Sequence, residues 1–371
     1  MPTQSNLSLV ATVTGVLVLW LSPALSLADS FTQTNLVSDV AGLAATIDPN
    51  LRNPWGMSFS ATSPFWVSNQ VSGNVTLYDG AGTIIPLVVS VPGGAPPTGP
   101  TGQVFSGTTS FALPGSGATH FIFATLNGTI EGWSSGTTAV QVVSTPGAVY
   151  TGLALASSGG STYLYAADST GQIRVFNSSY QPTTLTGNFT DPHPVAGFVP
   201  FNIQLIGSSL YVTYARLTAQ GAALPGGYVD VFNTNGTFSQ RLATGGPLDA
   251  PWGITLAPST FGNLGDDLLV GNFGNGEINA VNPITGAFAG TLAGINGLPL
   301  VNDNLWALDF RTGGGNIDPN ALYFTAGIND QRDGLLGDIT PSIPEPDTFI
   351  LVGLGVFALG VGRLYQARTW R

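Results

Sequence analysis

The chain has no cysteine, no lysine and only two histidines among its 371 residues. Without cysteine it has no disulfide framework, no thiolate metal site and no cysteine nucleophile. The lack of lysine excludes a P-loop and a lysine Schiff base. A Ser-His-Asp triad needs a positioned histidine base, and neither a Gly-x-Ser-x-Gly elbow nor a Gly-x-Gly-x-x-Gly fingerprint is present. Two-carboxylate glycosidase chemistry stays open, because two suitably spaced Asp or Glu side chains would suffice.

Charge of either sign is also scarce, since charged residues make up 8% of the chain and the formal net charge is −11. Between residues 29 and 341 there are six arginines against 18 acidic residues. Nucleic-acid binding needs a basic footprint, so a nucleic-acid partner is excluded. A chain rich in Gly, Ser, Thr and Asn with net negative charge is suited to life outside the cell.

The N-terminus has the pattern of a secretory signal peptide. An uncharged, largely apolar stretch runs from Leu9 to Leu21, and Ser26-Leu27-Ala28 places small residues before a cleavage point. We therefore predict a signal peptide over residues 1–28 with cleavage after Ala28.

The C-terminus combines a short motif, an apolar run and a basic end. Pro344-Glu345-Pro346 is followed by an uncharged run from Phe349 to Gly362 and then by an arginine-bearing end. Fourteen residues of helix are ~21 Å long, which is short against a hydrocarbon core of ~30 Å. The position at the chain end and the basic residues after it nevertheless favour a membrane segment over residues 349–362.

These three parts closely resemble the bacterial PEP-CTERM sorting signal, over about residues 342–371. The resemblance implies cleavage near Pro344-Glu345-Pro346 by an exosortase-type membrane peptidase during export. It also implies a location in the cell envelope or outside the cell, with at least transient anchoring by the C-terminus.

The middle of the chain contains six copies of one unit with a period close to 50 residues. Each copy has a small residue followed by alternating apolar positions, and aromatic residues often precede it. The copies are Gly56-Met-Ser-Phe59, Gly102-Gln-Val-Phe105, Gly152-Leu-Ala-Leu155, Asn202-Ile-Gln-Leu205, Gly253-Ile-Thr-Leu256 and Ala307-Leu-Asp-Phe310. A repeat of this length indicates a solenoid, a propeller or an array.

Further strand patterns follow each of these signatures. A second run such as Phe65–Asn69 or Leu268–Asn272 follows in every copy, and a third follows a glycine turn in five copies. These runs are rich in β-branched and aromatic residues, and no long segment between the two ends shows helical periodicity. We therefore predict an all-β fold over residues 29–341, a six-bladed β-propeller of four-stranded antiparallel blades.

A propeller ring must also close. The sixth unit lacks an outer strand of its own, because the chain turns into the sorting tail after Asp338. We predict that the segment from Asn35 to Ser38 supplies this strand from the N-terminus. Closing one blade from both ends of the domain would lock the ring.

Several short segments resemble the sequences of an uncharacterised bacterial family whose members often carry PEP-CTERM tails. They are Asn53-Pro-Trp-Gly56, Pro200-Phe-Asn-Ile203, Ala250-Pro-Trp-Gly253 and Tyr323-Phe-Thr-Ala-Gly-Ile-Asn329. That family is similar to six-bladed propellers of the NHL and gluconolactonase type. The resemblance covers roughly residues 33–339 and implies the fold, but no established activity.

One face of the predicted disc gathers aromatic and polar residues. In each meander the start of the first strand and the end of the second lie on the same side, and propeller sites usually occupy the channel mouth. The predicted ligand-binding face comprises Trp55, Asn69, Asp168, Asn202, Tyr214, Trp252, Asn272, Asp303 and Trp306. For the tryptophans, packing between blades is the simpler interpretation, and stacking on a sugar ring is the alternative.

Calcium is the candidate cofactor at this face. Oxygen ligands from Asp168, Asn202, Asn272 and Asp303 would suit an ion that takes 6–8 oxygens in irregular geometry. The resemblance to gluconolactonase-type propellers, which hold such an ion in the channel, implies the same. The alternative is that these Asn and Asp side chains cap turns at strand ends.

Three hypotheses for function remain. The first is a surface-associated propeller that binds or scaffolds exopolysaccharide or another envelope component. The second is a calcium-dependent hydrolase or lactonase at the channel mouth. The third is a passive structural component without a specific ligand.

Overall fold

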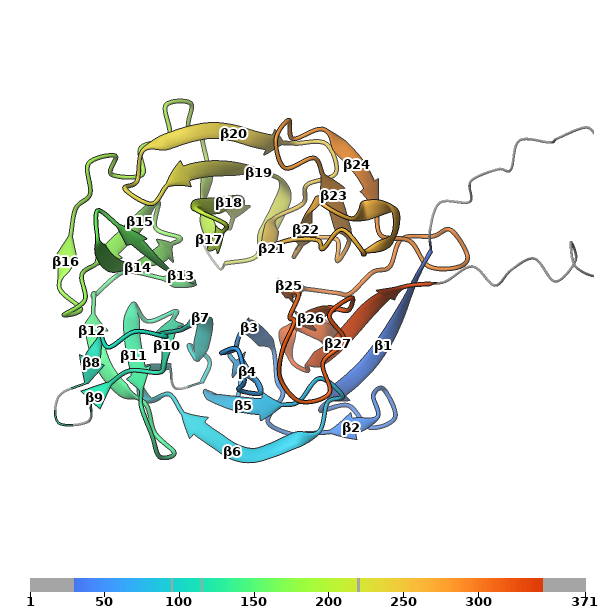
Figure 1. Cartoon of the computed structure of the whole chain (residues 1–371), viewed down its shortest axis with the longest axis horizontal. Coiled ribbons are helices and arrows are strands. Elements are labelled where there is room, and N and C mark those ends of the chain that lie inside the picture. Colours follow the sequence, from blue (N-terminus) through green and yellow to red (C-terminus); the bar gives the residue numbers. More distant parts are fainter. Residues whose placement is uncertain (1–29, 95, 114, 116, 219–220, 343–371) are drawn as a thin grey trace, which may run out of the picture.

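Six antiparallel sheets surround one axis in the computed structural model, which describes residues 30–342 apart from 95, 114, 116 and 219–220 (Figure 1). The predicted six-bladed β-propeller is confirmed. In each of blades 1 to 5 the first strand lies at the axis and the later strands follow outward. The alternating apolar residues of these strands form the cores between neighbouring blades.

Blades 1 to 3 occupy the first half of the chain. Blade 1 comprises β3 (Pro54–Ser58), β4 (Phe65–Asn69), β5 (Asn74–Tyr78) and β6 (Ile84–Ser90). Blade 2 comprises β7 (Pro100–Phe105), β10 (Phe121–Thr125), β11 (Thr129–Trp133) and β12 (Val140–Ser144), with a separate hairpin of β8 (Ala112–Leu113) and β9 (Gly117–Ala118). Blade 3 comprises β13 (Tyr150–Ser158), β14 (Ser161–Asp168), β15 (Gln172–Phe176) and β16 (Pro182–Thr183).

Blades 4 to 6 complete the ring. Blade 4 comprises β17 (Phe198–Ile206), β18 (Ser209–Leu217), β19 (Ala223–Asn233) and β20 (Phe238–Thr244). Blade 5 comprises β21 (Pro251–Leu256), β22 (Leu268–Asn272), β23 (Ile278–Val281) and β24 (Phe288–Thr291). Blade 6 comprises β25 (Leu305–Asp309), β26 (Leu322–Ala326), β27 (Leu335–Pro341), β1 (Phe31–Ser38) and β2 (Thr46–Ile47). The described helices are the short α1 (Ile328–Gln331), η1 (Pro92–Gly94) and η2 (Gly262–Leu264).

The small residue of each repeat lies where neighbouring inner strands approach most closely. A Cβ atom added at Gly102 would meet the backbone N of Leu153 at 2.5 Å and the Cα of Gly152 at 2.6 Å. At Gly253 it would meet the carbonyl O of Trp306 at 2.3 Å. Because these neighbours are backbone atoms that cannot rotate away, the close approach explains the glycines of the repeat pattern.

The ring closes through strands from both ends of the described chain. β1 pairs antiparallel with β27, from Phe31 opposite Pro341 to Ser38 opposite Leu335. The predicted contribution of residues 35–38 is confirmed, and the strand begins four residues earlier than expected. β2 adds a fifth, parallel strand outside β1. The backbone N–H of Ser342 also donates to the carbonyl O of Ser30 at 2.7 Å, so the two ends of the described chain are held together.

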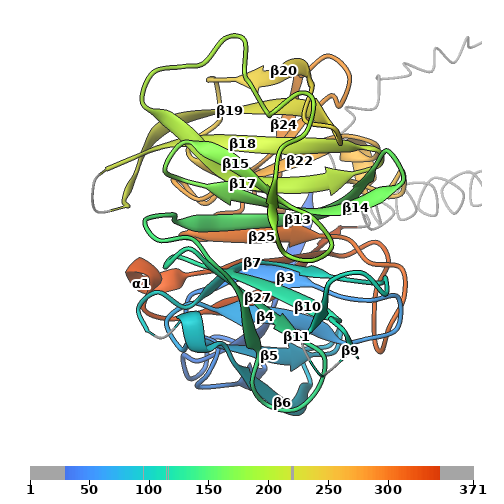
Figure 2. The same cartoon turned by 90° about the vertical axis from the view of Figure 1, so that its left-hand side faces the viewer.

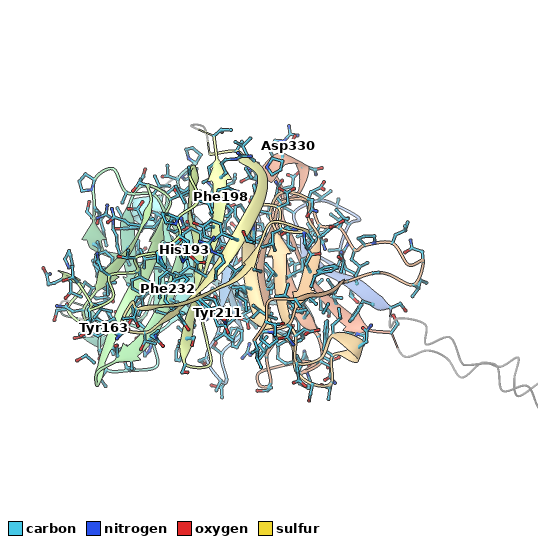
Figure 3. The ribbon with its side chains drawn as sticks, turned by 90° about the horizontal axis from the view of Figure 1, so that it is seen from above. Tyr163, His193, Phe198, Tyr211, Phe232 and Asp330 are labelled. Carbon is cyan, nitrogen blue, oxygen red and sulfur yellow. The ribbon has the colours of Figure 1, made fainter. Side chains whose placement is uncertain are left out.

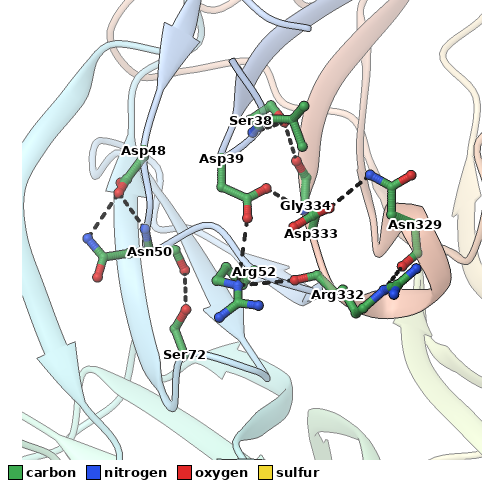
Figure 4. A network of polar contacts seen from close by, with 11 residues as sticks. Ser38, Asp39, Asp48, Asn50, Arg52, Ser72, Asn329, Arg332, Asp333 and Gly334 are labelled. Atoms are coloured by element: carbon green, nitrogen blue, oxygen red, sulfur yellow. Dashed lines mark hydrogen bonds and ion pairs between the residues drawn. The ribbon is translucent and has the colours of Figure 1, made fainter.

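Polar contacts reinforce this closure beside blade 1 (Figure 4). Asp39 accepts a hydrogen bond from the backbone N–H of Gly334 at 2.8 Å, and the Ser38 hydroxyl donates to the Gly334 carbonyl at 2.7 Å. Arg52 lies 3.7 Å from Asp39 and donates to the carbonyl O of Arg332 at 3.1 Å. The segment after β1 is thereby tied both to blade 1 and to the loop before β27.

The propeller has two distinct faces (Figures 2 and 3). We call upper the face on which inner strands begin, where Phe198 and Asp330 lie, and lower the face on which they end, where Tyr163 and Tyr211 lie (Figure 3). The short helix α1 projects from the upper face (Figure 2). The strand topology thus agrees with the prediction that the start of the first strand and the end of the second strand of each blade lie on the same face.

The two predicted processing segments lie outside the described residues. They are the signal peptide over 1–28 and the sorting tail, with Pro344-Glu345-Pro346 and the apolar run 349–362. Within residues 30–342, no helix has the length and apolar character needed to cross a membrane.

Candidate functional site

An aromatic cluster closes the axis of the propeller near the upper face. The Trp55 and Trp306 rings stack with centroids 3.6 Å apart, and Trp252 meets Trp306 edge-on at 5.6 Å. Phe273 and Phe201 lie 4.3 Å and 5.9 Å from Trp306. We call these five residues the aromatic plug. All five are buried, and their rings pack against one another.

The three tryptophan N–H groups of the plug differ in their partners. Trp252 donates to the carbonyl O of Thr151 at 3.1 Å, and Trp306 donates to the side-chain oxygen of Asn53 at 2.9 Å. The Nε1 of Trp55 is buried and has no hydrogen-bond partner among the described residues. Native structures rarely leave a buried donor unpaired, so this N–H group differs from the other two in the plug.

A cavity of about 570 Å³ lies above the plug, and we call it the upper mouth cavity. Trp55 and Phe201 form part of its wall, and the other walls come from the upper-face ends of the strands and their loops. The lining residues are Trp55, Gln70, Leu126, Val149, Thr151, Ser169, Thr170, Gly197, Val199, Phe201, Leu217, Thr218, Gly221, Ala222 and Gln331. A cavity of this size falls within the range of small-molecule sites.

Among the described residues, the lining of the upper mouth cavity carries no ionisable side chain. Its polar groups are the hydroxyls of Thr151, Ser169, Thr170 and Thr218 and the amides of two glutamines. The Asn53 side chain orients these amides, since its nitrogen donates to Gln70 at 2.8 Å and to Gln331 at 3.2 Å. Uncharged donors and acceptors surrounded by apolar side chains can bind a neutral polar ligand. They provide no general acid, no general base and no charged metal ligand.

Two carboxylates have partners within the protein, namely the predicted Asp168 and also Asp48, which precedes β3. Asp48 accepts a hydrogen bond from the Tyr78 hydroxyl at 2.8 Å. Asp168 forms an ion pair with Arg174 at 2.7 Å and caps the turn after β14 by accepting from the Thr170 N–H at 3.0 Å. Neither carboxylate lines the upper mouth cavity.

The remaining predicted residues are distributed over separate blades, and Asn202 does not line the upper mouth cavity. Asn202 lies at the axis and donates to the Trp252 carbonyl at 2.9 Å, whereas Asn272 donates to the Pro247 carbonyl at 2.7 Å. Asn69 donates to Thr76 at 2.8 Å, and Asp303 is exposed. Among the described residues, no three acidic or histidine side chains are grouped to hold a metal ion. The calcium site of Asp168, Asn202, Asn272 and Asp303 stays a prediction.

Tyr214, the last of the predicted residues, packs inside blade 4. Its ring stacks on Tyr228 at 4.2 Å, and the Arg241 guanidinium lies 3.8 Å from the centre of the Tyr228 ring. Burial raises the pKa of the Tyr214 hydroxyl, and the nearby Asp230 charge raises it further. Tyr214 is therefore a neutral packing residue at physiological pH and does not line the upper mouth cavity.

A second cavity opens below the plug and was not predicted from the sequence. It has a volume of about 270 Å³ and continues inward into a space of about 20 Å³ that Trp252 bounds. We call it the lower funnel. Its walls share no residue with the upper mouth cavity, because the aromatic plug lies between them.

The lower funnel contains one carboxylate, that of Asp309 at the end of β25. Loss of hydration raises the pKa of Asp309 to about 7, although the Phe310 backbone N–H and the Arg311 charge both act to lower it. A signal for this residue exists in the repeat. Two positions after the small residue the six copies carry Ser58, Val104, Ala154, Gln204, Thr255 and Asp309, and only the last is ionisable.

Comparison with known proteins gives a family but no activity. A PEP-CTERM protein-sorting motif matches residues 342–363, so the predicted sorting signal is confirmed. This motif implies export, processing by an exosortase and C-terminal sorting to the cell surface. The chain is 32% identical over 325 residues to uncharacterized protein R648 of Acanthamoeba polyphaga mimivirus, covering 82% of this chain and 78% of that protein.

The chain belongs to the same family as R648. Another mimivirus protein of the family, uncharacterized protein L690, is 29% identical over 325 residues, covering 82% of this chain and 84% of its own length. Among solved structures, streptogramin B lyase is 12% identical with a TM-score of 0.46, covering 84% of this chain and 98% of that one. A TM-score this low carries no statement about activity.

Proposed function

We propose that this protein is an exported binding module whose upper mouth cavity holds an uncharged, hydroxyl-rich ligand, such as a segment of extracellular polysaccharide. The observation that carries the proposal is the composition of the cavity wall, which combines hydroxyls, amides and apolar side chains without an ionisable group. Neutral sugars present hydroxyls at their edges and apolar C–H faces, so such a wall suits both of their surfaces.

The unpaired N–H of Trp55 supports the same proposal. The Trp55 side chain is 5% exposed, lines the cavity and has no partner for its Nε1 among the described residues. Leaving a buried donor unsatisfied costs about 1–3 kcal/mol. A ligand hydroxyl that accepts this hydrogen bond would recover that free energy, which gives the cavity a preference for ligands with acceptor oxygens.

The attachment of the chain ends supports a role at a surface. β1 and β27 lie side by side at the rim of blade 6, so both processing segments join the disc at its edge (Figure 1). Under the proposal, cleavage follows Ala28, and the run 349–362 anchors the chain at least transiently. A propeller held by its rim leaves the upper mouth cavity open to the surroundings.

Calorimetry with the full chain tests this proposal, with neutral oligosaccharides from the producing cell's matrix as probes and acidic oligosaccharides for comparison. Ala222→Trp should fill the upper mouth cavity and abolish binding, since Ala222 is an exposed lining residue. Ala112→Trp is the matched control, because Ala112 is equally exposed but lies in the β8–β9 hairpin. Equal binding by both variants would overturn the proposal.

The same preparation discriminates the other two hypotheses for function. Turnover of lactones that depends on added Ca²⁺ would replace the binding module with a calcium-dependent hydrolase. A thermal melt that responds neither to Ca²⁺ nor to any saccharide would instead favour a passive structural component, because a ligand of the native state raises the melting temperature.

A further inference from the structure

The lower funnel has an apolar rim around a polar interior. Phe59, Phe105, Leu155 and Leu205 line it, and all four occupy the third position after the small residue of their repeats. None of the four is fully buried. Four blades thus place large apolar side chains at equivalent repeat positions around one opening, which provides contact surface for a small organic molecule.

The polar interior offers hydrogen-bond acceptors that the chain itself does not use. The Gln103 nitrogen donates to the carbonyl oxygens of Gly56, at 2.8 Å, and Trp66. Because both partners are acceptors, the orientation of this amide is fixed and its oxygen remains free. This oxygen and the Ser58 hydroxyl have no partner among the described residues, although Gln103 and Ser58 are only 6% and 8% exposed.

The Asp309 carboxylate adds a charge to these acceptors. No described arginine or histidine forms an ion pair with it. The nearest cation in sequence, Arg311, donates instead to the carbonyl oxygens of Ser60, at 3.2 Å, and Ser63. Its guanidinium lies 4.6 Å from the centre of the Phe59 ring. The buried Arg311 is thereby held by these backbone carbonyls and by Phe59, and the Asp309 carboxylate has no ion-pair partner among the described residues.

We propose that the lower funnel binds a small organic amine, whose ammonium group donates to Asp309, Gln103 and Ser58 while its apolar body packs against the rim. An ammonium group supplies three donors and no acceptor, which complements an interior with unused acceptors and one negative charge. Hydrogen bonds between charged partners are roughly twice as strong as neutral ones. A rim with Phe59 and Phe105 also favours a cation close to aromatic rings.

A divalent metal fits the funnel less well than an amine does. The lining of its outer part includes one carboxylate, and the other polar side chains there are two amides and one hydroxyl among eight apolar residues. Ca²⁺ usually takes 6–8 oxygens with several carboxylates among them. The apolar rim would remain without a partner in a metal complex. The proposal does not depend on the upper mouth cavity, since the plug separates the two sites.

Ligand-observed NMR with the full chain tests the proposal through three probes of one shape. n-Butylamine combines charge and N–H donors, n-butyltrimethylammonium keeps the charge without donors, and n-butanol keeps a donor without charge. We expect n-butylamine to bind most tightly and Asp309→Asn to weaken it by roughly tenfold or more. Asp303→Asn, which removes an exposed carboxylate on the upper face, should leave its binding unchanged.

A second variant protects the test against misfolding of Asp309→Asn. Leu155→Trp should fill the half-buried rim and abolish n-butylamine binding while the carboxylate remains. Binding that survives both Asp309→Asn and Leu155→Trp would overturn the proposal, as would equal affinity for n-butylamine and n-butanol. Displacement of the amine by millimolar Ca²⁺ would assign the funnel to a metal instead.

Discussion

The upper mouth cavity and the lower funnel lie on one axis of one repeated scaffold, yet they differ in chemistry. Loops and strand ends from several blades line the upper cavity, and its wall is uncharged. Inner-strand residues line the lower funnel, and a single substitution in the sixth repeat supplies its carboxylate. In this protein the upper site therefore depends on loops between strands, whereas the lower site depends on a few equivalent positions of the repeat.

The largest expected effect comes from removing the barrier between the two sites. Trp306→Ala should lower the free energy of unfolding by about 3–5 kcal/mol, because the side chain is 1% exposed and packs against four aromatic rings. Urea denaturation measures the loss. Phe288→Ala is the control, since Phe288 is 53% exposed and should change stability by less than about 0.5 kcal/mol. A similar small loss for Trp306→Ala would contradict the plug as the centre of axial packing.

A smaller effect tests the scaffold that both sites share. Gly102→Ala should cost about 1–3 kcal/mol, because the added methyl group meets the backbone of the next blade at 2.5 Å. Gly290→Ala on the outer strand β24 is the matched control, with its nearest neighbour, a leucine side chain, at 3.6 Å. Both variants are compared by thermal melting. Equal melting temperatures would show that the inner strands separate easily and that close packing does not explain the repeat.

The third prediction concerns pH and the lower funnel alone. The pKa of Asp309 is raised in the folded state to about 7, so the folded protein holds this proton more tightly than the unfolded chain does. Its ionisation therefore reduces stability as the pH rises from about 4 to 8. Asp309→Asn should remove this decline and stabilise the protein at pH 8, with little effect at pH 4. Denaturation curves at both pH values measure the unfolding free energies of wild type and variant. A difference between the two proteins that does not change with pH would refute this prediction.

The smallest expected effect separates two tryptophans of the plug. Trp252→Phe loses packing contacts and the hydrogen bond to Thr151. Trp55→Phe loses packing contacts but no hydrogen bond, because the Trp55 N–H has no partner among the described residues. Trp55→Phe should therefore be less destabilising, by about 1 kcal/mol. Unfolding free energies of both variants give this difference. If the two losses are equal, the Trp55 N–H has a solvent partner, and its argument for a ligand in the upper mouth cavity fails.

Much of the fold was predictable because its signals are local. The alternation at Gly56, Gly102 and the other repeat starts follows from strands that bury both faces between blades, and glycine is required where backbones approach. Ring closure followed from counting strands, since a sixth blade of three strands needs one from elsewhere. The additional strand β2 and the β8–β9 hairpin were not predicted, because two-residue strands leave no periodic pattern.

The candidate sites were less predictable for a different reason. Strand topology indicated the upper face, but the upper mouth cavity lacks the carboxylates expected there, because Asp48 and Asp168 turn to Tyr78 and Arg174. The lower funnel was missed altogether. Its carboxylate was visible in the repeat alignment, but its loss of hydration depends on side chains from four other blades.

The sequence by itself determined the all-β repeat and the sorting signal at the C-terminus, because each depends on residues near one another in the chain, and the strand that closes the ring followed from the strand missing in the sixth repeat. Only the tertiary structure decided which side chains share a cavity and which partner each buried charge takes. Those choices depend on contacts between blades about 50 residues or more apart, where no local pattern records which of several neighbours a side chain will meet.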